Sequence, residues 1–311
     1  MPFECTAGKA QELQAEVLVC FTPKLTKVPS GLLNQINKAA DGDLANRVES
    51  GEFTGAGGQV TVLMGLDDFA AQRVLLVGLG DKEKVDADAY RRAMGTLSRH
   101  RTLSYAAEAL VFFDKSTDKA AYQAVAEGYL LGAFKHLDYK TGDDAVDGRR
   151  LKKLIFAVED KRQSRALQSG VERGEIIAEG QILTRRLAAT PSADLTPKLY
   201  AKEVQKLAKK YGFDCKILDE KAIAKEKMAA LLGVAAGSEE PPRFIIMEHK
   251  GGRAGQAPIV LVGKGVTFDS GGISLKPGLN MHEMKQDMAG SAAVVAALTT
   301  AARLNIKQNI V

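Results

Sequence analysis

Residues 262–277 read VGKGVTFDSGGISLKP and follow a short apolar run, Pro258–Val262, that predicts a β-strand. Four glycines in this stretch let the backbone turn sharply and come close to a ligand. In open α/β sheets, ligands bind at the carboxyl ends of strands. The stretch therefore indicates an apolar strand that ends at Lys264, a ligand-binding loop after it, and an α/β sheet around both.

The alternation of apolar runs and helical patterns continues upstream. Strands are predicted at Val17–Phe21, Val60–Met64, Val74–Val77, Ala109–Phe113 and Leu154–Val158. Helices are predicted between them at Ala87–Thr102 and Ala120–Phe134. Because alternating strands and helices build parallel sheets, the first part of the chain predicts an α/β layer fold with a largely parallel sheet.

A long helical pattern at Ser164–Leu187 separates this region from a second α/β series. The elements of that series are predicted as helices at Pro197–Tyr211, Ala222–Leu231 and Ala289–Ala297, and as strands at Asp214–Leu218, Arg243–Glu248 and Pro258–Val262. We therefore expect an N-terminal α/β domain at 1–160, an interdomain helix at 161–190 and a further domain at 191–311.

Composition and charge narrow the class of protein. The 311 residues are 45% hydrophobic and 26% charged, with a net charge of +5. No apolar run approaches the roughly 18–20 residues that span a bilayer, and the first residues lack the order of a secretory signal. Three scattered cysteines predict free thiols in a reducing compartment. We expect a cytoplasmic protein without membrane contact, whose interleaved lysines and acids form a solvated surface.

Two carboxylates and two amines lie on the glycine-rich loops. Asp269 is followed, 18 residues later, by Asp287 in the segment MHEMKQDMAGSAA at 281–293. Carboxylate oxygens suit Mg²⁺, Mn²⁺ or Zn²⁺, and a lysine amine joins them only when it is neutral. Taken singly, Asp-Ser-Gly-Gly is typical of a plain turn, and Lys264 and Lys276 are typical of surface lysines.

Other chemistries fit the sequence poorly. Gly263-Lys264-Gly265 lacks the spacing of a phosphate-binding loop, and the surroundings of Ser270 do not form the G-x-S-x-G elbow of serine hydrolases. No H-E-x-x-H helix occurs. Gly78-Leu79-Gly80 lacks the third glycine of a dinucleotide fingerprint, and we interpret it as a turn.

Residues 262–293 closely resemble the signature of the cytosol (leucyl) aminopeptidase family, which consists of two-metal exopeptidases that assemble as hexamers. Further likeness lies in RVLLVGLGDK at 73–82, in AEGYLLGAF at 126–134 and in residues 232–243. The resemblance implies a macro-like N-terminal α/β domain. It also implies that 191–311 is the first part of an α/β catalytic domain of the zinc-exopeptidase type, a metallopeptidase domain that these residues leave incomplete.

The resemblance also implies a role for each site residue. Lys264, Asp269 and Asp287 match metal ligands, with Asp269 bridging two divalent ions, Zn²⁺ or Mn²⁺, that generate a hydroxide nucleophile. Lys276 matches the lysine that stabilises the oxyanion. Met284 matches a residue that lines the pocket for the first side chain of the substrate, and core packing is its alternative role.

Some residues depart from the family pattern or fall outside it. His282 and Glu283 match no ligand of the family, and we expect them to be loop residues. Ala189 stands where the family usually has an asparagine before Thr190-Pro191. A second acidic motif, with an Asp, a Glu and an Arg that holds bicarbonate, does not occur in the 311 residues. We expect it beyond Val311, in a longer protein.

The sequence thus predicts a two-metal aminopeptidase that removes leucine-like N-terminal residues from peptides, and a homo-hexamer for the complete enzyme. Two alternatives remain open at this point. One is a DNA-binding or regulatory protein that uses its N-terminal domain, which a lysine and arginine stripe along a groove and a steep salt dependence would support. The other is an inactive fragment that lacks the second ligand motif.

The first testable prediction concerns these 311 residues alone. We expect them to hydrolyse leucine amides negligibly, because the second acidic motif and the bicarbonate-holding arginine are not among them. The measurement is turnover in Mn²⁺ or Zn²⁺ buffer beside that of a longer form of the protein. Comparable turnover would mean that the active site is misplaced.

Overall fold

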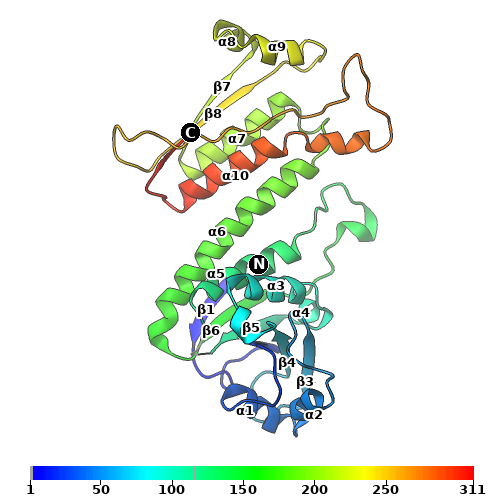
Figure 1. The fold of residues 1–311 in the computed structure, drawn as a ribbon, viewed down its shortest axis with the longest axis vertical. Helices are drawn as coiled ribbons and strands as arrows, with labels where there is room; N and C mark the ends of the chain where they lie inside the picture. The colour runs from blue at the N-terminus through cyan, green and yellow to red at the C-terminus, as the bar shows by residue number, and fades with distance from the viewer. Residues whose placement is uncertain (1–2, 115–116) are drawn as a thin grey trace. The chain divides into compact units, whose positions relative to one another are not determined.

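The computed structural model describes residues 3–114 and 117–311 (Figure 1). It divides into two compact units, Met1–Ala178 and Glu179–Val311. The division falls inside one continuous helix, α6 (Ser164–Ala189), so the chain passes from the first unit to the second without leaving helical structure.

The first unit is built on a six-stranded sheet. Its strands are β1 (Phe3–Ala7), β2 (Val17–Thr22), β3 (Val60–Met64), β4 (Arg73–Gly78), β5 (Glu108–Phe113) and β6 (Lys153–Val158). Their order in the sheet is β1-β6-β5-β2-β4-β3, and every neighbouring pair is parallel except β3 and β4. The prediction of a largely parallel α/β sheet is confirmed.

Helices cover both faces of this sheet. Successive side chains along each strand point to opposite faces, so each buried strand contributes to two separate clusters. On β2, Val17 and Val19 belong to one buried cluster, whereas Leu18 and Cys20 belong to the other. The first cluster includes residues of α3 (Ala87–Leu97) and α5 (Ala120–Ala133), and the second includes residues of α1 (Leu32–Ala39) and α2 (Asp43–Glu49). The unit is therefore a three-layer α/β/α fold.

Glycines let α3 and α5 pack backbone against backbone. A Cβ atom at Gly128 of α5 would collide with the carbonyl oxygen of Arg91 on α3, and one at Gly132 would lie 2.6 Å from the carbonyl oxygen of Gly95. At the same contact, Nε of Arg91 donates to the buried carboxylate of Glu127 at 2.6 Å. Close packing and a charge-assisted hydrogen bond therefore join the two helices.

The helix predicted at Ala87–Thr102 is wrong in extent. The structure ends α3 at Leu97 and begins a separate short helix, α4 (Arg101–Tyr105). Ser98 lies at the break, where its buried hydroxyl donates to the carbonyl oxygen of Gly95 at 2.8 Å. A serine side chain that bonds to the backbone in this way competes with helical hydrogen bonds and favours a helix end.

The start of α3 provides a stability test. Asp86 caps the helix, because its carboxylate accepts from the backbone N–H of Ala89 at 2.8 Å. We expect Asp86→Ala to lower the free energy of unfolding by about 1 kcal/mol, since that N–H loses its partner. Asp86→Asn keeps an acceptor and should cost less. Urea unfolding followed by circular dichroism measures both, and equal midpoints for Asp86→Ala and the unaltered chain would contradict the cap.

The second unit places two helices on one face of a small antiparallel sheet. The sheet has the order β7-β8-β9. After α6, the elements of this unit are α7 (Pro197–Tyr211), β7 (Asp214–Leu218), α8 (Glu220–Lys225), α9 (Ala229–Ala235), β8 (Phe244–Lys250), α10 (Ala289–Arg303) and β9 (Asn309–Ile310). Val204 of α7, Met247 of β8 and Leu298 of α10 share one buried core. This core positions the start of α10, which directly follows the segment that carries the predicted site residues.

Two predicted elements of this unit differ from the structure. The helix predicted at Ala222–Leu231 is split into α8 and α9 by Lys227, whose φ of 58° is left-handed and incompatible with a continuing helix. The strand predicted at Pro258–Val262 is reduced to a single parallel bridge between Ile259 and Ile310. Its backbone is bonded to the end of the chain only through residues 259 and 261, so no continuous ladder forms.

Short 3₁₀ turns lie at Lys82–Lys84, Gly142–Ala145, Lys161–Gln163 and Met281–Gln286. The cysteines Cys5, Cys20 and Cys215 are all free thiols. Burial raises the pKa of Cys20 far above its ordinary value, which makes it an unreactive core residue. In the part of the chain that the structure describes, no helix combines the length and the apolar character needed to cross a bilayer.

Candidate functional site

The predicted site residues lie on the segment that runs from the end of the sheet to α10, and four of them form two ion pairs. Nζ of Lys264 lies 2.7 Å from Oδ1 of Asp287, and Nζ of Lys276 lies 2.7 Å from Oδ2 of Asp269. The charge of Lys264 also acts on Asp269. The structure therefore gathers the two carboxylates and two amines that the sequence singled out.

Asp269 is held as a carboxylate by its own turn. Its Oδ1 accepts from the backbone N–H of Gly271 at 2.8 Å. The pKa of Asp269 is lowered from its ordinary value, first by the hydrogen bond from Lys276 and then by that from Gly271. Gly271 has a φ of 107°, a conformation that favours glycine, so the turn depends on this residue type.

Lys276 lies at the end of the same turn. Its backbone N–H donates to the carbonyl oxygen of Ser270 at 2.9 Å, which closes the loop. Its Nζ also approaches Sδ of Met284 at 3.1 Å. Met284, predicted as a wall of the substrate pocket, therefore contacts the predicted oxyanion lysine.

Asp287 has one paired and one unpaired oxygen. Oδ1 accepts from Lys264, whereas Oδ2 is buried and has no hydrogen-bond partner among the described residues. A buried carboxylate oxygen without a partner is costly, and a bound cation is one way to satisfy it. Asp287 therefore fits the role of a metal ligand.

The remaining donors fit a divalent ion only in part. Asp269 supplies oxygen ligands of the kind that Mn²⁺ and Zn²⁺ accept, and the amine of Lys264 lies beside Asp287. Within residues 3–114 and 117–311, no three His, Cys, Asp or Glu side chains converge as a metal site. His282 and Glu283, predicted as loop residues, are exposed on the 3₁₀ turn Met281–Gln286.

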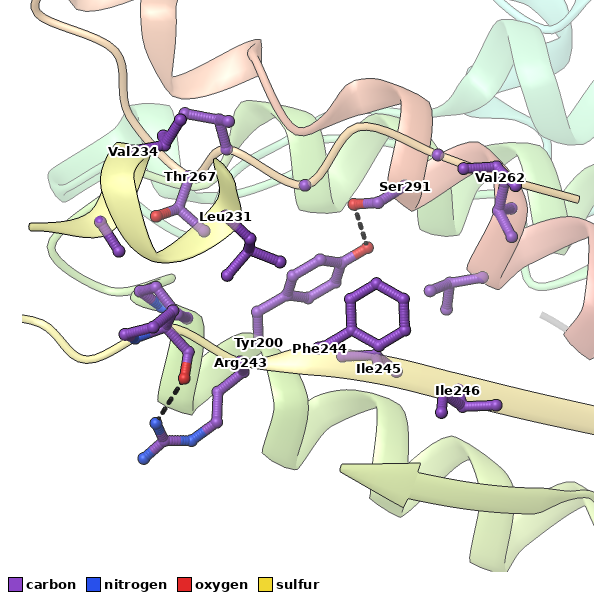
Figure 2. Close-up of a pocket in the computed structure, with 18 of the residues that line it drawn as sticks. Tyr200, Leu231, Val234, Arg243, Phe244, Ile245, Ile246, Val262, Thr267 and Ser291 are labelled. Carbon is purple, nitrogen blue, oxygen red and sulfur yellow. Dashed lines mark hydrogen bonds between the residues drawn. The ribbon is translucent and has the colours of Figure 1, made fainter. Parts of the chain in front are cut away.

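An apolar cavity of about 680 Å³ lies beside this segment (Figure 2). Its walls come from α7, α9, β8, the segment 260–268 and α10. Gly263 and Gly265, on either side of Lys264, line it, whereas none of the four charged residues does. The cavity therefore adjoins the charged cluster without containing it.

The sequence did not predict two residues that link this cavity to the cluster. Figure 2 shows the Tyr200 hydroxyl pointing to that of Ser291, and the two oxygens are 3.0 Å apart. Tyr200 belongs to α7 and Ser291 to the first turn of α10. Burial raises the pKa of Tyr200 to about 12, so its phenol keeps its proton. The one signal in the sequence was a serine among the small apolar residues at 289–293.

Two family models match the chain. Residues 17–143 match the N-terminal domain of the cytosol aminopeptidase family, and residues 182–311 match its catalytic domain. The two matched ranges together make up most of the chain. They favour the peptidase interpretation over the DNA-binding alternative.

Relatives in several bacteria agree. The probable cytosol aminopeptidase of Nitrosococcus oceani is 34% identical over 317 residues, which cover 100% of this chain and 63% of that protein. That of Ralstonia pickettii is 38% identical over 291 residues, which cover 91% of this chain and 58% of that protein. The chain therefore spans less than two thirds of the length of these relatives.

Solved structures have the same fold. The bottromycin maturation enzyme BotP in complex with Mn has a TM-score of 0.75 and 30% identity, with 95% of this chain and 58% of that chain covered. A mutant of tomato leucine aminopeptidase has a TM-score of 0.79 at 24% identity, with 99% of this chain and 61% of that chain covered, and supports the fold alone. The family model for the N-terminal domain matches first along the sequence, and the model for the catalytic domain follows it. The chain therefore belongs to the cytosol aminopeptidase family.

Proposed function

We propose that the chain contributes one part of the active site of a metal-dependent aminopeptidase. The observation that carries the proposal is the cluster of two carboxylates and two lysine amines, with the buried and unpaired Oδ2 of Asp287, in a member of this family. Family membership supports the peptidase class. The cluster supports the location of the site.

In this proposal Lys264, Asp269 and Asp287 would hold two divalent ions, and Asp269 would be a ligand of both. When bound, Zn²⁺ or Mn²⁺ polarises a carbonyl group and makes water a nucleophile at neutral pH. Lys264 now donates a hydrogen bond to Asp287 at 2.7 Å, so its amine must release a proton before it can act as a ligand. The Mn complex of BotP supports Mn²⁺ as the first ion to test.

Lys276 keeps its proton and stabilises the negative charge that develops on the substrate oxygen. Its amine is held by Asp269 and lies against Met284, which places a cation beside an apolar side chain. A leucine-like first residue of a peptide would lie against Met284 and present its carbonyl to Lys276. The proposal extends to the whole protein as a cytoplasmic hexamer in which bicarbonate assists as a base.

Metal content separates the two aspartates. In a metal-containing form of the protein, we expect Asp269→Ala to release both ions, because a bridging carboxylate serves two centres. Asp287→Ala should release mainly one. Elemental analysis of dialysed protein measures this, and Glu283→Ala, which removes an exposed carboxylate from the neighbouring turn, is the control expected to retain both. Two tightly held ions in Asp269→Ala would refute the bridging role.

A further inference from the structure

The segment that carries Lys264 is attached to the rest of its unit by few bonds. Among the described residues, one backbone hydrogen bond joins residues 262–268 to another element, and it runs from the N–H of Ser291 to the carbonyl oxygen of Lys264 at 2.9 Å. Val262 is 90% exposed, so its side chain contributes little packing to the segment. The position of Lys264 therefore depends on Ser291.

Glycines make this bond possible. A Cβ atom at Gly263 would lie 2.5 Å from the carbonyl oxygen of Gly290 and 2.5 Å from Cα of Ser291, so a side chain at 263 would push the segment away from α10. Without one, the backbone of the segment lies directly against the first turn of the helix.

The hydroxyl of Ser291 is itself fixed from two sides. It donates to the carbonyl oxygen of Met288 at 3.0 Å. A serine hydroxyl has a single proton, so the 3.0 Å contact with Tyr200 must be a hydrogen bond donated by the phenol. Tyr200 is 3% exposed and belongs to the core between α7 and α10. A buried core residue therefore holds the hydroxyl of Ser291.

We propose that Tyr200 and Ser291 are a positioning pair that holds Lys264 beside Asp287. The pair acts through the backbone. The phenol of Tyr200 holds the hydroxyl of Ser291, and the N–H of Ser291 holds the carbonyl oxygen of Lys264. The amine of Lys264 then pairs with Asp287, the residue before Met288, whose carbonyl oxygen accepts from the same Ser291 hydroxyl. The inference rests on the proposed function, because it gives this geometry the purpose of bringing two metal ligands together. Partners that orient ligands in this way typically change metal affinity by 10- to 100-fold when they are removed.

The test compares Tyr200→Phe with Tyr211→Phe. Both tyrosines lie on α7, but the ring of Tyr211 contacts Lys210 and Arg303 through its face, and its hydroxyl has no hydrogen bond to any residue that the structure describes. Amide exchange at Ser291, followed by NMR, is the first readout. We expect about tenfold faster exchange in Tyr200→Phe and no change in Tyr211→Phe, because loss of one buried hydrogen bond corresponds to about one power of ten. Equal exchange rates in the two variants would overturn the inference.

Mn²⁺ affinity of the longer form of the protein, measured by titration calorimetry at a temperature where both variants stay folded, is the second readout. We expect Tyr200→Phe to bind Mn²⁺ about 10- to 100-fold more weakly than Tyr211→Phe. If the unaltered protein binds Mn²⁺ and Tyr200→Phe binds it equally well, the positioning role is wrong and the proposed function stands. If the longer form of the unaltered protein binds no Mn²⁺, the proposed function is contradicted, while exchange at Ser291 still decides whether the pair holds Lys264.

Discussion

Replacing Lys276 by alanine is expected to lower the turnover of an active form of the protein by about 100- to 1000-fold while its metal content stays the same. The amine of Lys276 is held 2.7 Å from Asp269 and 3.1 Å from the sulfur of Met284, where it can meet the oxygen of a peptide carbonyl. Loss of a charged oxyanion partner costs about 3–4 kcal/mol in the transition state. Because the lysine is not a metal ligand in this proposal, the ions should remain.

The matched variant is Lys264→Arg, which should lose or weaken an ion. Arginine keeps its positive charge and its proton, so it can pair with Asp287 but cannot coordinate a metal. Steady-state kinetics and elemental analysis on both variants give the answer. If Lys264→Arg binds metal normally and Lys276→Ala loses it, the two roles are reversed.

Gly128→Ala should strongly lower the stability of the first unit. The added methyl group would collide with the backbone of Arg91, and backbone atoms cannot move aside as a flexible side chain can. We expect the free energy of unfolding to fall by about 3 kcal/mol, near the upper end of the usual cost of overpacking. The buried ion pair of Glu127 with Arg91 would be strained by the same displacement.

Gly95→Ala is the control for this prediction. A Cβ atom at Gly95 would meet only the carbonyl oxygen of Gly128, at 3.5 Å, which is ordinary van der Waals contact. It should therefore cost little, and helix propensity even favours alanine by up to about 1 kcal/mol. Chemical denaturation of the two variants measures the difference. Similar midpoints would mean that α3 and α5 separate at low cost and that the glycines are not needed for close packing.

The sequence predicted the elements whose side chains repeat with a clear period. The central residues of β2 and β4 are apolar because helices cover both faces of the sheet. Helix α7 matches its predicted bounds because Thr196 and Gly212 cap it. The first strand, Phe3–Ala7, was missed. Its residues alternate apolar and polar but include one large apolar side chain, Phe3, and its partner strand Leu154–Val158 is far away in the sequence.

The breaks in the predicted helices were missed for a different reason. Ser98, which bonds to Gly95, interrupts one regular helical pattern, and Lys227, with its left-handed φ, interrupts another. Neither residue type signals a helix break by itself. At the site, residue types and spacing led to Lys264, Asp269, Lys276 and Asp287, which the fold brings into pairs. The link through Tyr200 depends on two helices meeting in space, which spacing along the chain does not reveal.

The place of β1 in the sheet has a consequence for the order of folding. β1 pairs only with β6, Phe3 opposite Leu154, although β2 to β5 all lie between them in the sequence. As the chain leaves the ribosome, β1 is made first but gains its partner last. Until then the backbone groups of β1 are unpaired, and unpaired strand backbone is a template for pairing with other chains. Pairing of β1 with β6 is thus a late step of folding. Its delay is governed by translation of the residues between β1 and β6.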